Sequence, residues 1–203
     1  MVKKDEIEKC KNENGYIFTS DVFDNNISHY ELRECVAKYN YEKVANGIYI
    51  SKDTIPDMYY ILSIKNMKLV FCLESALYLN GLMEHEPEMM TVSIPRGYNA
   101  THLRKKGIKI ISKNNEIYEL GITHIRTALG NVARTYDMEK TICDIIKNKN
   151  KMDVQIFSYA MKEYVRRKDK NLIKLISYSR QMRIEDEVRK YLEVLMWYIM
   201  HNR

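Results

Sequence analysis

The sequence is poor in residues that interrupt helices and strands, since its 203 residues include only three prolines and seven glycines. It also lacks any apolar run near the roughly 18–20 residues that span a bilayer, so we expect no membrane segment. The opening Met-Val-Lys-Lys-Asp-Glu precedes no apolar stretch, which argues against a secretory signal. These absences favour a cytoplasmic protein.

Cysteine is scarce and dispersed. Cys10, Cys35, Cys72 and Cys143 lie far apart and form no C-x-x-C pair of the kind used for zinc or redox chemistry. In a chain of this length such cysteines are typical of buried, reduced thiols.

Recognisable catalytic motifs are also missing. There is no P-loop, G-x-G-x-x-G or G-x-S-x-G, and the five histidines never pair at helical spacing. The Asp-x-Lys and Glu-x-Lys pairs typical of metal-dependent nucleases do not occur either. We therefore expect no enzyme activity, no metal and no cofactor. One alternative stays open, a scattered carboxylate site on Asp137, Glu139 and Asp144, although Asp137 also fits a helix N-cap and the others fit helix charges.

What the sequence does contain is ordinary for a globular chain, with 45% hydrophobic and 30% charged residues. Its 33 Lys+Arg against 27 Asp+Glu give a net charge of +6. This excess permits a polyanionic partner without identifying one, so the position of the charges matters more than their sum.

The first fifty residues predict a compact series of short elements. A charged helix over residues 3–13 is followed by a strand at Tyr16–Phe18. A helix of one or two turns then begins with Thr19 or Ser20 as its cap and ends at Asn25-Asn26.

A third helix and a hairpin complete this series. Ser28 followed by Glu31 has the spacing of a capping box, which predicts a helix start. Asn46-Gly47 between two β-prone runs predicts a hairpin with a type I′ turn, which needs positive φ at both positions. The helix has one apolar stripe at helical spacing, formed by Leu32, Cys35, Val36 and Tyr39.

This order is that of a winged helix-turn-helix, with the third helix as recognition helix and the hairpin as wing. The alternative is another small α+β domain with the same element order. We assign residues 1–51 to the DNA-binding domain.

Residues 52–147 predict an α+β section with a small mixed sheet of four to six strands. Helices are expected from Pro56 and over residues 74–80, and a further helix is expected after Tyr136-Asp137. Residues 69–73 form an apolar run, and short strands are expected at 90–94, 108–111, 117–120, 122–126 and 131–135.

Residues 148–203 predict a helical region with three apolar stripes, the longest running from Ile184 through Leu192 to Tyr198 and Ile199. Trp197 on the last helix is expected in the core. The whole chain is thus expected to be α+β, with a winged helix-turn-helix, a central α/β section and a C-terminal helical region.

Dividing the charge along these boundaries is informative. Residues 1–50 hold 7 basic and 9 acidic side chains, residues 51–146 hold 12 and 11, and residues 147–203 hold 14 and 7. The excess therefore lies in the C-terminal helices, where it is either a solvated face or a surface for the nucleic-acid backbone. Candidates for such a surface are Arg166, Arg167, Lys168, Lys174, Arg180 and Arg183.

The face of the third helix opposite its apolar stripe supplies candidate base readers. His29, Tyr30 and Arg33 lie near the start of that helix, where a recognition helix meets base edges, and Arg33 suits guanine. Phosphate or wing contacts are expected from Thr19, Ser20, Ser28, Lys38, Lys43 and Asn46.

Several segments together resemble the AbiEi-type antitoxin family. The run from Tyr16-Ile17-Phe18-Thr19 through Ile27-Ser28 to Asn46-Gly47-Ile48-Tyr49 is similar to its N-terminal winged helix, although Asn40-Tyr41 replaces the usual glycine before the wing. Later segments that resemble the family are Glu74–Leu82, Thr91–Gly97 and Arg134–Asp144, so the likeness extends over residues 16–147.

The resemblance implies an antitoxin of a type IV toxin–antitoxin system acting in abortive infection, a form of phage defence. It implies double-stranded DNA as partner, namely inverted repeats in the protein's own promoter, and repression of its own operon. It further implies that the protein counters a nucleotidyltransferase toxin without requiring direct contact.

Two other readings stay open from the residues alone. One is a winged-helix transcriptional regulator whose C-terminal part senses a ligand or dimerises. The other is a nucleic-acid enzyme in which the winged helix only targets a distant catalytic part.

Overall fold

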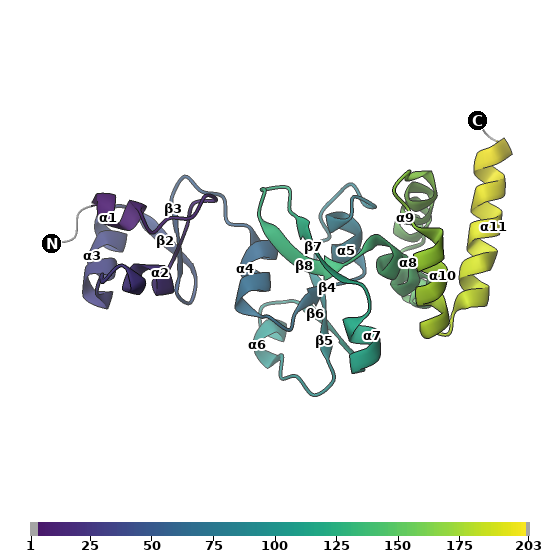
Figure 1. Ribbon diagram of the computed structural model, residues 1–203, viewed down its shortest axis with the longest axis horizontal. Coiled ribbons are helices and arrows are strands. Elements are labelled where there is room, and N and C mark those ends of the chain that lie inside the picture. Colours follow the sequence, from purple (N-terminus) through teal and green to yellow (C-terminus); the bar gives the residue numbers. More distant parts are fainter. Residues whose placement is uncertain (1–3, 202–203) are drawn as a thin grey trace. The chain divides into compact units, whose positions relative to one another are not determined.

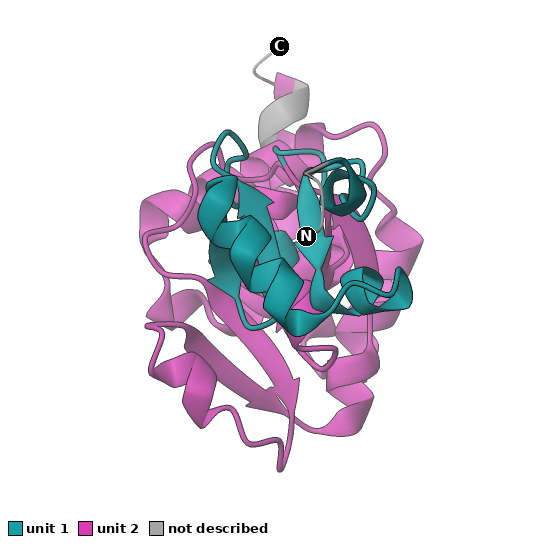
Figure 2. Cartoon of the chain, turned by 90° about the vertical axis from the view of Figure 1, so that its left-hand side faces the viewer, with its two compact units in different colours: residues 1–62, 128–131 teal, residues 63–127, 132–203 magenta. Residues whose placement is uncertain are grey.

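The computed structural model describes residues 4–201, apart from the side chains of residues 4 and 198–200. The chain is a mixed α+β protein, as predicted, and its described residues contain one three-stranded and one five-stranded sheet (Figure 1). It divides into two compact units, coloured separately in Figure 2. Unit 1 comprises residues 1–62 and 128–131, and unit 2 comprises residues 63–127 and 132–203.

Unit 1 has the predicted order of elements. Its sheet is antiparallel, with β3 in the centre between β1 and β2. The predicted first helix is shorter than expected, because the chain turns at Cys10 and Lys11 bridges to Ile17 beside β1. The elements are α1 (Lys4–Glu8), β1 (Tyr16–Phe18), α2 (Thr19–Asp24), α3 (His29–Lys38), β2 (Tyr41–Ala45) and β3 (Ile48–Ser51).

The caps of the two helices differ. The capping box at α3 is confirmed, because Ser28 Oγ accepts from the Glu31 amide while Glu31 accepts from the Ser28 amide at 2.9 Å. The predicted cap of α2 is wrong, since Phe18 occupies the N-cap position and no side chain caps this helix. Phe18 is the last residue of β1 and keeps an extended backbone, so helix α2 begins directly at Thr19.

The hairpin forms where Asn46-Gly47 predicts it, but the type I′ turn is wrong. Gly47 has φ +71° whereas Asn46 does not enter the positive-φ region, and the register shifts between Lys43 and Ala45. A hairpin can also be closed by one glycine with positive φ next to a β-bulge, and this arrangement is compatible with the right-handed twist of the strands. Asn40 has φ +56° just before β2, so an asparagine takes the left-handed conformation that glycine adopts most readily.

The core of unit 1 joins the three helices to the sheet. Leu32 and Cys35 of α3 are buried with Ile7, Val22 and Tyr49. Val36 and Tyr39 pack against this core, so the whole predicted stripe of α3 faces inward. The opposite face of α3 is therefore left to solvent.

Unit 2 is built around a mixed sheet of order β6-β5-β4-β8-β7. β4 pairs antiparallel with β5 and parallel with β8, while β5 and β6 are parallel and β7 and β8 antiparallel. The predicted helix after Pro56 is α4 (Met58–Lys65), along which the division between the units falls. The strands are β4 (Val70–Phe71), β5 (Thr91–Pro95), β6 (Lys109–Lys113), β7 (Ile122–Arg126) and β8 (Val132–Tyr136).

The strand predicted at 117–120 is wrong, because residues 117–119 belong to helix α7 (Asn115–Glu119) and Leu120 is its C-cap. A short apolar run does not separate strand from helix by periodicity, and here Tyr118 is buried on one face of a single helical turn. The other short helices of the unit are α5 (Glu74–Leu79), as expected, and α6 (Thr101–Arg104).

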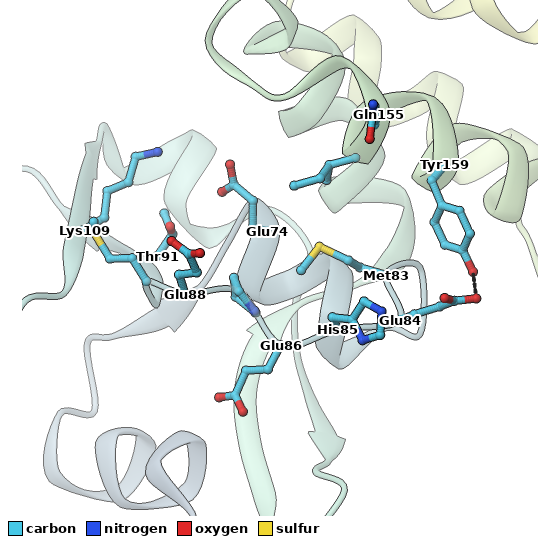
Figure 3. Close-up of a pocket in the computed structure, with 13 residues that line it drawn as sticks. Glu74, Met83, Glu84, His85, Glu86, Glu88, Thr91, Lys109, Gln155 and Tyr159 are labelled. Carbon is cyan, nitrogen blue, oxygen red and sulfur yellow. Dashed lines mark hydrogen bonds between the residues drawn. The ribbon is translucent and has the colours of Figure 1, made fainter.

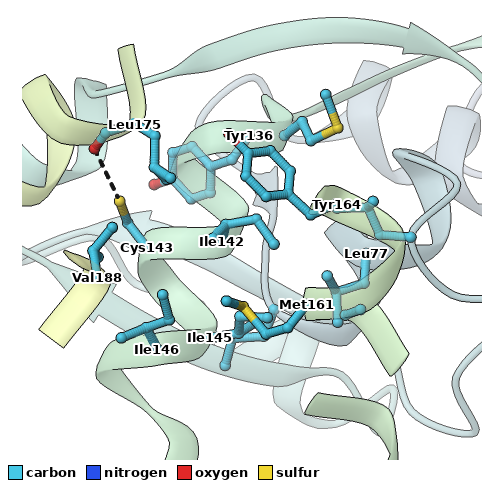
Figure 4. Close-up of a cluster of buried hydrophobic side chains, with 14 of the residues drawn as sticks. Leu77, Tyr136, Ile142, Cys143, Ile145, Ile146, Met161, Tyr164, Leu175 and Val188 are labelled. Carbon is cyan, nitrogen blue, oxygen red and sulfur yellow. Dashed lines mark hydrogen bonds between the residues drawn. The ribbon is translucent and has the colours of Figure 1, made fainter. Parts of the chain in front are cut away.

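The C-terminal helices share one core with the sheet. Every residue of α8 (Met138–Lys147) except its last is buried, and α8 packs against α5, α9 (Val154–Arg166), α10 (Leu172–Gln181) and α11 (Glu185–His201). Figure 4 shows Leu77, Ile142 and Tyr164 meeting in this core. Removing the C-terminal helices would therefore expose the centre of unit 2.

Trp197 is not in the core, contrary to the prediction, since it is 61% exposed. The buried face of α11 runs through Val188 and Leu192, and Trp197 falls on another side of the helix. The side chains of Tyr198 and Ile199 lie outside the described residues. All four cysteines are buried, as predicted, and none of them forms a disulfide within the described residues. None of the helices in residues 4–201 is both long and apolar enough to cross a membrane.

Candidate nucleic-acid interface

The outer face of α3 presents the predicted base readers to solvent. His29, Tyr30 and Arg33 are all exposed, and Tyr30 keeps 71% of its surface accessible. The Phe23 and His29 rings lie 6.0 Å apart. The three side chains come from the first two turns of one helix, which is the part of a recognition helix that meets base edges.

The two glutamates of this face are engaged by neighbouring side chains. Glu31 is held by Ser28 in the capping box. A hydrogen bond with Glu34 raises the pKa of the Tyr30 hydroxyl. Arg33 has no ion pair within the described residues, so its guanidinium is available to an external acceptor.

The candidate phosphate contacts are spread over α2, α3 and the hairpin. Ser20, Ser28, Lys38, Lys43 and Asn46 are exposed, and Lys38 lies over the Tyr39 ring at 5.3 Å. Ser20 Oγ is 3.0 Å from Asp21 Oδ1 and donates to it.

Thr19 is the exception, being half-buried. Its amide donates to the Gly47 carbonyl at 3.0 Å, which ties the start of α2 to the hairpin turn. Its hydroxyl is buried without a hydrogen-bond partner. Thr19 therefore holds the hairpin turn in place, and its buried hydroxyl is poorly placed to contact a phosphate.

The candidate basic surface of the C-terminal helices is largely neutralised by neighbouring carboxylates. Arg167 Nε and Asp169 Oδ1 are 2.7 Å apart, and Arg180 Nε and Glu185 Oε2 are also 2.7 Å apart. Lys168 and Arg183 have no ion pair within the described residues. The remaining pairs join Arg166 to Glu163 at 2.7 Å and Lys174 to Asp137 at 2.9 Å.

A second set of cations was missed by the charge division. Residues 89–115, which we call the acid-free segment, contain no Asp or Glu but six Lys or Arg. They span β5, the short helix α6 and β6 of unit 2. Five of the six are exposed and have no ion pair within the described residues, namely Arg96, Arg104, Lys105, Lys106 and Lys109.

The sixth cation of that segment is used internally. Lys113 Nζ lies 2.6 Å from Asp144 Oδ2, and Lys140 Nζ lies 2.7 Å from Asp144 Oδ1. Both ammonium groups also lie 4.4 Å from the centre of the Tyr136 ring. Burial alone would raise the pKa of the Asp144 carboxyl, but Lys140 and Lys113 outweigh it and hold this pKa below its usual range.

The three carboxylates of the scattered site have separate structural partners. Asp137 caps α8 by accepting from the Lys140 amide at 2.8 Å, while buried Glu139 accepts from the Asn171 amide at 2.8 Å. Asp144 is held by its two lysines. In the described part of the chain, no three His, Cys, Asp or Glu side chains gather as metal ligands.

Comparison with known proteins gives a fold relationship. No protein-family model and no curated protein matches the sequence. The structure is similar to the crystal structure of the RV2827C protein from Mycobacterium tuberculosis, with a TM-score of 0.58 and 10% sequence identity. The match covers 90% of this chain and 76% of that chain. At this identity the likeness concerns the fold alone.

The sequence does contain a pattern that identifies the acid-free segment, namely 27 consecutive residues without Asp or Glu. Charge divided by domain gives residues 51–146 nearly zero net charge, because acids elsewhere in that section offset these cations. A search for long stretches without acidic residues finds the segment directly. The sequence does not show which cations form ion pairs, because the partners can be far apart along the chain. Lys174 and Asp137, for example, are separated by 37 positions.

Proposed function

We propose that the protein is a DNA-binding autorepressor and type IV antitoxin of the AbiEi kind, and that it acts without catalysis. Unit 1 is the winged helix-turn-helix in this proposal, with α3 as recognition helix and the β2–β3 hairpin as wing. Its supports are the element order of unit 1 and the residues that resemble this family. Antitoxin action against a nucleotidyltransferase rests on that resemblance.

The observation that carries the DNA-binding proposal is the outer face of α3. Its cation Arg33 has no ion pair within residues 4–201, whereas the acids Glu31 and Glu34 are held by Ser28 and Tyr30. An exposed arginine on the second turn of a helix suits bidentate contact with guanine O6 and N7. Lys43 of the hairpin suits phosphate.

We further propose that backbone affinity comes mainly from the acid-free segment. Its five unpaired cations are exposed, whereas most candidate cations of the C-terminal helices face carboxylates within hydrogen-bonding distance. A cation already paired gains less from a phosphate because its present partner must first be released.

The DNA-binding proposal is tested by mobility shift with DNA from upstream of the protein's own gene. Arg33→Ala should cost about 1–3 kcal/mol of binding free energy and relax one position of the site, because it removes a base contact. Lys43→Ala should weaken all sequences alike. Lys9→Ala, an exposed cation of unit 1 outside α3 and the hairpin, is the matched control and should bind as wild type.

Equal losses on specific and random DNA for Arg33→Ala and Lys43→Ala would contradict the assignment of α3 as reader. Antitoxin action is tested separately, by co-expression with a nucleotidyltransferase encoded beside the gene. Rescue of growth supports the antitoxin proposal. DNA binding without rescue would instead favour a winged-helix transcriptional regulator.

A further inference from the structure

Unit 2 contains a pocket whose lining shares a single residue, Lys109, with the cations proposed above to contact DNA. It lies among the connection that follows α5, the start of β6 and the first turns of α9, and its volume is about 560 Å³ (Figure 3). Pockets that hold small molecules are commonly about 300–1,000 Å³ in volume and mostly apolar, with a few placed polar groups. This pocket therefore has the dimensions of a ligand site.

Carboxylates dominate the charges that line it. Glu74, Glu84, Glu86 and Glu88 all contribute to the lining, against Lys109 as the lining cation with a fixed charge. Of these, Glu84 accepts a hydrogen bond from the Tyr159 hydroxyl at 2.9 Å, which links the connection to α9. The lining therefore favours a positively charged occupant.

Glu74 supplies an independent reason to expect a ligand. Its Oε2 atom is buried and has no hydrogen-bond partner, although the side chain lines the pocket. Figure 3 shows the carboxylate standing among the other lining side chains. A buried carboxylate oxygen without a donor is costly, and a donor brought by a ligand would remove that cost.

The remaining lining is apolar and adaptable. Met83 and Met89 come from the connection after α5, and Ile156 comes from α9. Methionine side chains fit ligands of varied shape because they are unbranched and polarisable. The pocket thus combines a carboxylate that has one buried, unpartnered oxygen with an apolar wall.

We propose that this pocket binds a small organic cation, in which an ammonium or guanidinium group on an apolar body donates to Glu74. The apolar body lies against Met83, Met89 and Ile156, and the exposed carboxylates of Glu86 and Glu88 add attraction at the rim. This site does not depend on the proposed DNA-binding function, and its test uses no DNA.

The test compares three probes of equal length and different charge. Hexylammonium, hexanol and hexanoate are titrated into full-length protein labelled at the methionine methyl groups and followed by NMR. Hexylammonium should give saturable shifts at Met83 and Met89, at least tenfold more tightly than either other probe. Glu74→Gln should weaken this binding at least tenfold, whereas Glu116→Gln, an exposed acid of the same unit outside the pocket, should change it less than twofold.

The methyl signals distant from the pocket report whether the Glu74→Gln variant remains folded. Glu88→Gln is a second variant and should weaken hexylammonium binding about twofold to fivefold. Equal binding of hexanol, or full affinity in folded Glu74→Gln, would overturn the proposal. A peptide with lysine between two leucines that binds over tenfold more tightly than hexylammonium would also overturn it, in favour of a partner protein.

Discussion

The acid-free segment and the C-terminal helices are both rich in cations but use them differently. In the helices, four of the six candidate cations face a carboxylate at 2.7–2.9 Å. In the segment, Lys113 alone is ion-paired within the described residues, and the other five cations are exposed. Among these cations, the six candidates of the helices therefore include two without an ion pair in the described residues, whereas the segment contains five.

This difference teaches that net charge per domain is a poor guide to an electrostatic surface. A phosphate competes with whatever carboxylate a cation already faces, so local pairing decides how much attraction remains. Substitutions can separate cations that hold the structure together from cations that are available to a partner.

The largest effect is expected where cations are buried and paired. Asp144→Ala should lower the free energy of unfolding by about 3–5 kcal/mol, because it leaves the buried ammonium groups of Lys113 and Lys140 without a counter-charge. Urea unfolding measures this loss. Lys105→Ala, an exposed and unpaired cation of the segment, is the contrasting variant and should leave stability nearly unchanged.

Acid adds a check on the same group. Because the folded pKa of Asp144 is lowered, its contribution to stability is present above its unfolded pKa and is lost as the pH falls through the folded value. Asp144→Asn should flatten this acid-side slope. A stability loss below 1 kcal/mol in Asp144→Ala would show that the buried ion pairs are not holding the core.

A smaller loss of stability is expected where Lys174 of α10 pairs with Asp137 at the start of α8. Asp137 caps α8, accepts from the Tyr178 hydroxyl at 3.1 Å and pairs with Lys174. Asp137→Ala should cost about 1–2 kcal/mol, mostly through the lost cap. Lys174→Gln keeps the cap and removes only the ion pair, so it should cost less than about 1 kcal/mol. If thermal unfolding shows equal losses of stability in the two variants, the ion pair of Lys174 contributes as much to stability as the helix cap.

The smallest effect on stability is expected at the exposed pairs of the C-terminal helices. Glu185 accepts from both Arg180 and Arg189, at 2.7 Å in each case. Glu185→Gln should leave the thermal unfolding midpoint unchanged and raise affinity for random DNA about twofold, because it frees two arginines. Glu193→Gln, an exposed acid of the same helix outside these pairs, is the matched control. An unchanged affinity in Glu185→Gln would indicate that pairing is not what limits this surface.

Much of the fold follows from local signals in the sequence. Ser28 and Glu31 predict the start of α3, and Asn46-Gly47 predicts the hairpin, because capping and turn residues act over a few positions. The stripes of α8 to α10 predict helices that share a core. Residues 117–120 were misassigned because one apolar turn fits strand and helix equally.

The candidate site was less predictable, for a physical reason. The sequence identifies which side chains of α3 oppose its apolar stripe, and these are exposed as expected. It does not reveal that Lys113, Lys140 and Asp144 meet, since Lys113 comes from β6 and the others from α8. Long-range pairing depends on sheet order, which neither periodicity nor charge counts determine.

The most direct test of the account is the salt dependence of DNA binding in two matched triple variants. Arg104→Gln with Lys105→Gln and Lys106→Gln neutralises unpaired cations of the segment, and Arg166→Gln with Arg167→Gln and Arg180→Gln neutralises paired cations of the helices. We predict that the first variant lowers the slope of log affinity against log salt by about two to three and the second by less than about one. An equal or larger decrease in the second variant would contradict the account.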